Sequence, residues 1–171
     1  TDPRRYYYRQ GEFIGGENGS SLWEYWSQVN VQIDADKVYP VFAFNRVFVF
    51  WVKSEAITED NANASITTRD EGNNKQEVSS SSQVKYLVNI YFSFYDLNKE
   101  WVSAQALAAE IKEDNEIKDV QLFVENSNRL ILQNNSTLHE NIVINCSYKI
   151  KLQEEEGEQE QIKEFRLTPE L

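Results

Sequence analysis

Apolar and polar residues alternate at every second position over much of this chain. The run Gln28 to Ile33 alternates, and Val84 to Tyr95 alternates again with its apolar and aromatic side chains on one face. Successive side chains of a strand point to opposite faces, so this period predicts half-buried β-strands. The densest apolar stretches, Val38 to Phe44 and Val47 to Lys53, are separated only by Asn45-Arg46, which predicts a tight hairpin turn there.

The second half of the chain predicts more strands and one helix. Turn residues follow the strand Val84 to Tyr95 at Asp96 to Lys99. A short helix is expected over Ala104 to Glu113, with Ser103 as its N-cap, because this segment is rich in Ala, Leu and Glu and places Leu107 and Ile111 four residues apart. The remaining apolar runs predict strands at Ile117 to Val124, Arg129 to Gln133, Asn141 to Leu152 and Gln159 to Leu167, with turns at Asn126-Ser127-Asn128 and Glu156-Gly157-Glu158.

These elements predict an antiparallel all-β fold of about eight strands, either a β-sandwich or a fragment of a propeller. Residues 1–171 are expected to form a single domain with an N-terminal segment over residues 1–20. The segment Ser54 to Gln83 is almost wholly polar and includes four consecutive serines. Long polar segments inside a compact domain are usually loops, so we expect a mobile insertion over residues 54–83.

Composition narrows the classes of function. The 171 residues are 40% hydrophobic and 13% aromatic, which is enough for one sizeable core. The 28 acidic residues outnumber the 17 basic ones and give a net charge of -11, which argues against a nucleic-acid partner. A single Cys and a single His exclude disulfide frameworks, Cys-rich zinc sites and any site that needs two histidines, so no metal or other cofactor is expected.

The sequence contains neither a membrane span nor a signal peptide. Its best apolar run, Val38 to Val52, is interrupted by polar residues and is shorter than the roughly 20 residues that a spanning helix needs. The N-terminus lacks the apolar region of a signal peptide. Because the chain begins at Thr1 and contains no Met, we expect it to be a piece of a larger protein.

One acidic run, one histidine and one cysteine are candidates for chemistry. Cys146 lies in an alternating apolar run, which predicts a buried and unreactive thiol. His139 follows a polar stretch and is expected to be an exposed turn residue. A dense acidic run is interpreted either as a solvated loop or as a pH-sensitive interface, since carboxylates brought together by assembly repel one another; it consists of Glu154, Glu155, Glu156, Glu158 and Glu160.

The aromatic residues Trp23, Tyr25 and Trp26 also have two interpretations. They could stack on sugar rings, or they could pack at the end of a strand. Carboxylate pairs suited to glycoside hydrolysis are too numerous among 28 acids to single one out. No catalytic residue is assigned from the sequence.

One segment carries a family resemblance. A Trp is followed by alternating β-branched residues, an acidic turn, Pro-Val, and then Arg with a hydrophobic run that ends in Phe-Trp; the positions that define the pattern are Trp26, Pro40, Arg46, Phe50, Trp51 and, after a second hairpin, Trp101. This order resembles the neuraminidase-like domain of the A component of bacterial Tc toxin complexes, the large pore-forming subunits of insecticidal toxins. The resemblance covers roughly residues 21 to 102. One departure is the hairpin turn, where the family commonly has Asn-Gly and this chain has Phe44-Asn45.

The resemblance implies a structural role. In such toxins the secreted A subunit is a pentamer whose outer shell encloses a translocation channel, and the neuraminidase-like domains close the tip of the shell until a pH change opens it. The domain is similar to sialidases in fold only, and this chain lacks the sialidase pattern Ser-X-Asp-X-Gly-X-Thr-Trp. The resemblance therefore predicts a non-catalytic shell module whose partners are the other protomers of a homo-oligomer.

A rival hypothesis is a secreted β-domain that binds a carbohydrate or receptor on a host cell surface. It depends on Trp23, Tyr25 and Trp26 as stacking residues. A glycosidase is the third and weakest alternative.

Overall fold

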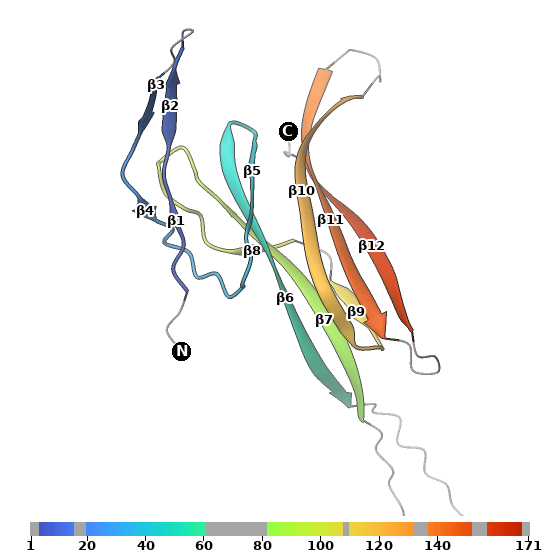
Figure 1. The fold of residues 1–171 in the computed structure, drawn as a ribbon. Helices are drawn as coiled ribbons and strands as arrows, with labels where there is room; N and C mark the ends of the chain where they lie inside the picture. The colour runs from blue at the N-terminus through green and yellow to red at the C-terminus, as the bar shows by residue number, and fades with distance from the viewer. Residues whose placement is uncertain are drawn as a thin grey trace, which may run out of the picture.

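A computed structural model describes residues 4–15, 20–60, 82–107, 110–131, 137–151 and 157–168. Within these ranges the chain forms twelve β-strands, all paired antiparallel, and no helix (Figure 1). The prediction of an antiparallel all-β fold is confirmed.

The first large sheet has five strands. Its strands are β5 (Tyr39–Ala43), β6 (Arg46–Asp60), β7 (Ser82–Phe94), β8 (Gln105–Ala106) and β9 (Ile111–Glu113). β6 lies between β5 and β7, and the far edge of β7 pairs with both β8 and β9. The long alternating runs of β6 and β7 make this sheet the centre of the molecule (Figure 1).

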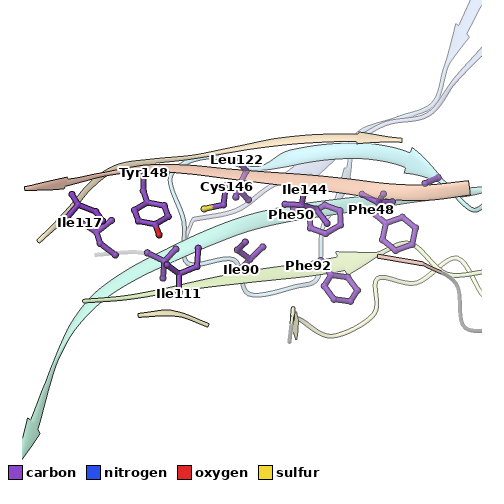
Figure 2. Packing of buried hydrophobic residues seen from close by; sticks show 14 residues of the cluster. Phe48, Phe50, Ile90, Phe92, Ile111, Ile117, Leu122, Ile144, Cys146 and Tyr148 are labelled. Carbon is purple, nitrogen blue, oxygen red and sulfur yellow. The ribbon is translucent and has the colours of Figure 1, made fainter. Parts of the chain in front are cut away.

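The second large sheet has three strands, in the order β10 (Ile117–Ile131), β11 (Thr137–Lys151) and β12 (Glu158–Leu167). The central strand β11 turns Ile144, Cys146 and Tyr148 toward the five-stranded sheet, where they meet Phe50 of β6 and Ile90 of β7 (Figure 2). All five side chains are buried. Apolar burial between the two sheets forms the main core and is the largest stabilising term of the fold.

A smaller core covers the opposite face of the five-stranded sheet. Val49 and Trp51 of β6 point away from the main core and pack against Val29 and Ile33. These two residues belong to the predicted strand Gln28 to Ile33, and their burial is as expected. The predicted strand is wrong beyond Gln28, because residues 29–33 cover the sheet face without a strand partner of their own.

Four short strands form what we call the N-terminal arm, residues 4–28. β1 (Tyr7–Tyr8) pairs with β4 (Ser27–Gln28), and β2 (Gly11–Ile14) pairs with β3 (Ser20–Trp23). The β2–β3 ribbon stands apart from the three-stranded sheet (Figure 1).

The predicted hairpin between β5 and β6 is confirmed. Phe44 and Asn45 both have positive φ, at 51° and 57°. Two consecutive left-handed residues are the signature of a type I′ turn. Asn45 adopts this conformation readily. Phe44 adopts it at a steric cost, which is offset by its edge-on contact with Phe48, with ring centroids 5.8 Å apart.

The predicted helix over 104–113 is wrong. Residues 105–106 and 111–113 are strands that pair with β7, and the Leu107 amide donates to the Ile90 carbonyl at 2.8 Å. Ile111 is fully buried in the main core. Helix propensity differs by only a few tenths of a kcal/mol per residue, so the unpaired edge of β7 and the burial of Ile111 override it.

The predicted turn at Asn126-Ser127-Asn128 is also wrong. β10 (Ile117–Ile131) continues through this segment, and Asn126 lies opposite Ile142 of β11. The Asn126 side-chain amide donates to the Phe42 carbonyl at 3.1 Å and to Glu140 Oε1 at 2.6 Å. A residue type that favours turns is therefore used here to connect β10 to β5 and β11.

The polar insertion expected over residues 54–83 is shorter than predicted. Residues 54–60 belong to β6 and residues 82–83 belong to β7, whereas residues 61–81 lie outside the described residues. Cross-strand ion pairs stabilise this polar part of the ribbon, because Glu59 lies 3.1 Å from Lys85 and 3.6 Å from Lys112. The Lys85 ammonium is the main cause that lowers the pKa of Glu59.

Candidate functional site

The N-terminal arm carries several large apolar side chains that are exposed to solvent. Of the ten large apolar side chains that are exposed in the described part of the chain, five lie here: Tyr7 (52% exposed), Leu22 (64%), Trp23 (48%), Tyr25 (96%) and Trp26 (61%). We call these five residues the aromatic surface. Leu22 and Trp23 are consecutive in β3 and therefore lie on opposite faces of the ribbon, but exposed apolar side chains that gather in one short segment mark a candidate binding region.

Arg9 organises two of the indole rings. Its Cζ atom lies 4.4 Å from the ring centroid of Trp23 and 4.8 Å from that of Trp26. A guanidinium group at this distance is attracted to the face of an indole. The contact restrains both rings within the chain itself.

Gly11 allows Trp23 to lie flat on the ribbon. The two residues are opposite each other in the β2–β3 register, and a Cβ atom at Gly11 would lie 2.6 Å from two Trp23 ring atoms. Only a glycine leaves room for the ring here. Sequence reasoning singled out Trp23 but missed Arg9 and Gly11, because the strand register that brings them together is not visible in composition.

A second aromatic cluster joins the arm to the five-stranded sheet. The rings of Tyr8, Tyr95 and Trp101 lie with centroids 5.3 to 5.7 Å apart, and the Tyr6 hydroxyl donates to the Ala35 carbonyl at 2.6 Å. Burial, followed by a hydrogen bond with Tyr95, raises the pKa of Tyr8 to about 12. The Trp101 Nε1 is buried and has no acceptor among the described residues, so aromatic contacts fix this ring.

The residues of the sequence signature are spread over the fold and do not form one site. Phe50 lies in the main core, Trp51 in the smaller core, and Trp101 at the base of the arm. The remaining three are at the surface or at an edge: Pro40 is exposed in β5, Arg46 lies over the Phe94 ring at 5.3 Å, and Trp26 belongs to the aromatic surface.

The acidic run is only partly described. Glu154, Glu155 and Glu156 lie outside the described residues, whereas Glu158 and Glu160 are exposed at the start of β12. Glu158 lies 3.5 Å from Lys149, which also lies 3.1 Å from Asp119. These two carboxylates, Asp119 first, raise the pKa of Lys149. Part of the acidic run is therefore already paired within the chain.

A buried tyrosine and a glutamate connect the two large sheets. Tyr148 is 1% exposed, and its hydroxyl donates to Glu113 Oε1 at 2.6 Å, while Lys163 lies 3.6 Å from the same oxygen. Burial, and then the hydrogen bond with Glu113, raises the pKa of Tyr148 above its usual range. No local pattern indicates this contact, because the composition around Glu113 favours a helix.

Cys146 and His139 are placed by the same strand. Cys146 is fully buried in the main core, so the prediction of a buried thiol is confirmed, and this burial raises the pKa of the thiol to about 11. His139 lies within β11 opposite Arg129, so its expected position in a turn is wrong. The strand continues to Thr137 because it pairs with β10 along that whole length.

The described ranges contain no group of three or more His, Cys, Asp or Glu side chains that could hold a metal ion. Within the same ranges, no helix has the length and apolar character needed to cross a membrane.

Comparison with known proteins identifies the family. No curated protein matches the chain. A family model described as the neuraminidase-like domain matches residues 1–155, which include the N-terminal arm, the five-stranded sheet and the paired strands β10 and β11. The chain therefore belongs to the neuraminidase-like domain family.

Proposed function

We propose that this chain is a non-catalytic shell and assembly module of the A subunit of a bacterial Tc toxin, where it contributes contacts between the protomers of a secreted pentamer. Membership of the neuraminidase-like domain family supports the proposal. The observation that carries it is the aromatic surface of the N-terminal arm.

The arm leaves large apolar side chains exposed that a neighbouring protomer could cover. Every described side chain from Ser20 to Gln28 is exposed, and the β2–β3 ribbon has only two strands. Isolated two-stranded ribbons are marginally stable in water, so covering this ribbon with a neighbouring protomer would stabilise both chains. The rings are pre-ordered by Arg9, which lowers the entropy lost on association.

A packing role for the Tyr148–Glu113 pair supports the non-catalytic part of the proposal. A tyrosine activated by a glutamate is a nucleophile only where substrate reaches the hydroxyl. Here the hydroxyl lies between the two sheets, and its pKa is raised rather than lowered. The pair serves to join the sheets.

The acidic run Glu154 to Glu160 is proposed as a pH-sensitive electrostatic lock between protomers. Carboxylates that face basic groups attract them at neutral pH, lose this attraction when they are protonated at acid pH, and lose it again when the basic groups discharge at alkaline pH. The net charge of -11 and the exposure of Glu158 and Glu160 support the assignment.

The oligomeric state of the complete subunit, expressed from its full gene, tests the proposal. We expect a ring-shaped oligomer in electron micrographs, and dissociation or loosening when Tyr25 and Trp26 are both replaced by Ala. Leu97→Ala is the matched control, because Leu97 is also exposed but lies in the turn after β7. A complete protein that is monomeric at every pH contradicts the proposal.

The lock is tested separately. Replacing the five glutamates of the acidic run by Gln should shift the pH at which the oligomer changes shape, whereas Glu125→Gln on β10 should not. An unchanged transition would contradict the role of the acidic run but not the assembly role.

A second candidate function is carbohydrate or receptor binding through the same surface. It is favoured by the 96% exposure of Tyr25 beside Trp26. A glycan array distinguishes the two functions: saturable binding that a folded Trp26→Ala variant loses would support carbohydrate recognition.

A further inference from the structure

A ring of protomers needs two different contact surfaces on each chain. When more than two protomers are related by cyclic symmetry, every interface joins one surface of a protomer to a different surface of its neighbour. In the proposed assembly the N-terminal arm supplies one of these surfaces. The second surface has to lie elsewhere on the same chain.

The outer face of the three-stranded sheet lies on the far side of the molecule from the arm. The base of the arm packs through Tyr6 and Tyr8 on the face of the five-stranded sheet that carries Trp51, whereas the three-stranded sheet covers the other face, which carries Phe50. The arm and the three-stranded sheet therefore flank the five-stranded sheet on opposite sides (Figure 1). A chain with contact surfaces on opposite sides can bind one neighbour through each of them.

Two large apolar side chains are exposed on this outer face. The strand registers place Phe123 of β10 opposite Asn145 and Ile162 of β12 opposite Ser147. Asn145 and Ser147 are the neighbours of the inward-pointing Cys146, so all four side chains point away from the main core. Phe123 is 62% exposed and Ile162 is 66% exposed. The outer face therefore offers apolar area that a neighbouring chain can cover.

Arg9 of the arm is a cation with no carboxylate partner among the described residues. Its Cζ atom lies over the rings of Trp23 and Trp26, whereas Arg4 forms an ion pair with Asp36. Stacking occupies the faces of a guanidinium group and leaves its N–H donors in the plane, where they pair with a carboxylate. Arg9 can thus bind a carboxylate of a neighbouring chain and keep its contact with the two indoles.

Glu160 is the matching carboxylate on the outer face. It is exposed in β12, on the same side of the sheet as Ile162 two residues later. Lys149 lies opposite Glu160 but forms its ion pairs with Asp119 and Glu158, and Glu160 has no ion pair within the described ranges. Glu160 also belongs to the acidic run proposed as a lock between protomers, and such a lock needs a basic group on the neighbouring chain.

We infer that the arm of one protomer docks on the outer face of the three-stranded sheet of the next protomer, an interface that rests on the proposed assembly of this chain. Tyr25 and Trp26 of the arm lie against Phe123 and Ile162 of the neighbour, and Arg9 pairs with its Glu160. A contact between two unlike surfaces passes from chain to chain, as a ring requires.

Photo-crosslinking of the complete subunit tests the docking. p-Benzoylphenylalanine in place of Tyr25 keeps an aromatic side chain at a position that is 96% exposed. Irradiation should join neighbouring protomers, and mass spectrometry should place the crosslinks within residues 121–125 or 158–166. The same photoreactive residue in place of Leu97, which is 74% exposed in the turn after β7, is the control and should not crosslink to these two segments.

Substitutions give an independent measurement on the complete subunit. Phe123→Thr combined with Ile162→Thr removes two apolar contacts but retains strand propensity, and should weaken association at least about tenfold. Val84→Thr is the matched control, because Val84 is exposed on β7, outside this face. Arg9→Gln and Glu160→Gln should each weaken association, and the two together should weaken it no further than either alone, because both remove the same ion pair.

The outcomes separate this interface from the assembly itself. An oligomer whose crosslinks from position 25 join arm to arm, reach another surface or do not form overturns the docking and leaves the assembly role standing. Full association of the folded double Thr variant, or additive effects of Arg9→Gln and Glu160→Gln, also overturns the docking. A complete subunit that is monomeric at every pH contradicts the docking and the assembly role together.

Discussion

The two large sheets and the N-terminal arm use the same residue types in opposite ways. In the sheets, aromatic and β-branched side chains of β6, β7 and β11 are turned inward and meet across a continuous core. In the arm, Trp23, Tyr25 and Trp26 remain in contact with water. The sheets have strands of up to 15 residues, whereas the strands of the arm have two to four.

The difference shows what stabilises each part. Apolar burial stabilises the sheets, and it grows with every residue of the interface between them. The arm depends on a few local contacts, such as the stacking of Arg9 on two indoles and the fit of Trp23 over Gly11. A region of this kind gains most from a partner, because its apolar area is still available to be covered.

Matched truncations in the two regions give the largest expected difference. Phe50→Ala empties part of the main core and should lower the free energy of unfolding by about 3 to 5 kcal/mol. Leu22→Ala in the arm should change it by less than about 0.5 kcal/mol, because the side chain is exposed. Urea denaturation measures both changes in unfolding free energy. Equal losses would contradict the proposed difference between the sheets and the arm.

Alkaline pH should destabilise the sheets through Cys146. The thiol pKa is 9.0 in its ordinary state and about 11 in the folded chain, so the folded state holds the proton more tightly. The resulting stability is present below about pH 9 and is lost as the pH rises toward 11. The loss amounts to about 2 to 3 kcal/mol, at 1.36 kcal/mol per pKa unit.

Urea denaturation across this pH range, on the unchanged chain and on Cys146→Ala, isolates the contribution of the thiol. The difference in unfolding free energy between the two proteins should change between pH 9 and 11, and a constant difference would count against it.

The hydrogen bond between Tyr148 and Glu113 should contribute less to the free energy of unfolding than a core side chain does. Tyr148→Phe removes a hydrogen bond to a carboxylate and should cost about 2 kcal/mol. Tyr25→Phe, at the most exposed tyrosine of the arm, should cost nothing measurable. Thermal unfolding of both variants would distinguish them, and a neutral Tyr148→Phe would show that the Glu113 contact contributes no net stability.

The smallest effect on global stability is expected in the arm. Gly11→Ala places a methyl group against Trp23, so the ring must move and the contact with Arg9, worth about 0.5 to 1 kcal/mol, is disturbed locally. Tryptophan fluorescence should change while the urea midpoint stays the same. Gly157→Ala meets no neighbouring atom and is the control. A large shift of the urea midpoint by Gly11→Ala would show instead that the arm unfolds together with the sheets.

Much of the fold was predictable because side-chain period is a local property. The alternation of Val84 to Tyr95 and of the run through Cys146 identified which faces are buried, and the position of the β5–β6 hairpin was correct. The prediction of a helix over 104–113 is wrong because this sequence favours a helix only in isolation. Its actual partner, the edge of β7, is contributed by residues 86–92.

The candidate surfaces were less predictable. The sequence marked Trp23, Tyr25 and Trp26 but left open whether they pack or face solvent. Their exposure, and the stacking of Arg9, follow from the projection of a two-stranded ribbon. The structure also brings residues 35–39 beside residues 117–120, a juxtaposition that no local pattern contains.

The all-β class, the inward faces of the long strands and the family can be predicted from residue order alone, because they depend on patterns over short distances. The strand partners, the two-sheet core, the Tyr148–Glu113 contact and the surfaces left uncovered emerge only from the folded chain. An apolar period specifies that a side chain will be buried, whereas pairing and packing between distant segments decide which residues it packs against.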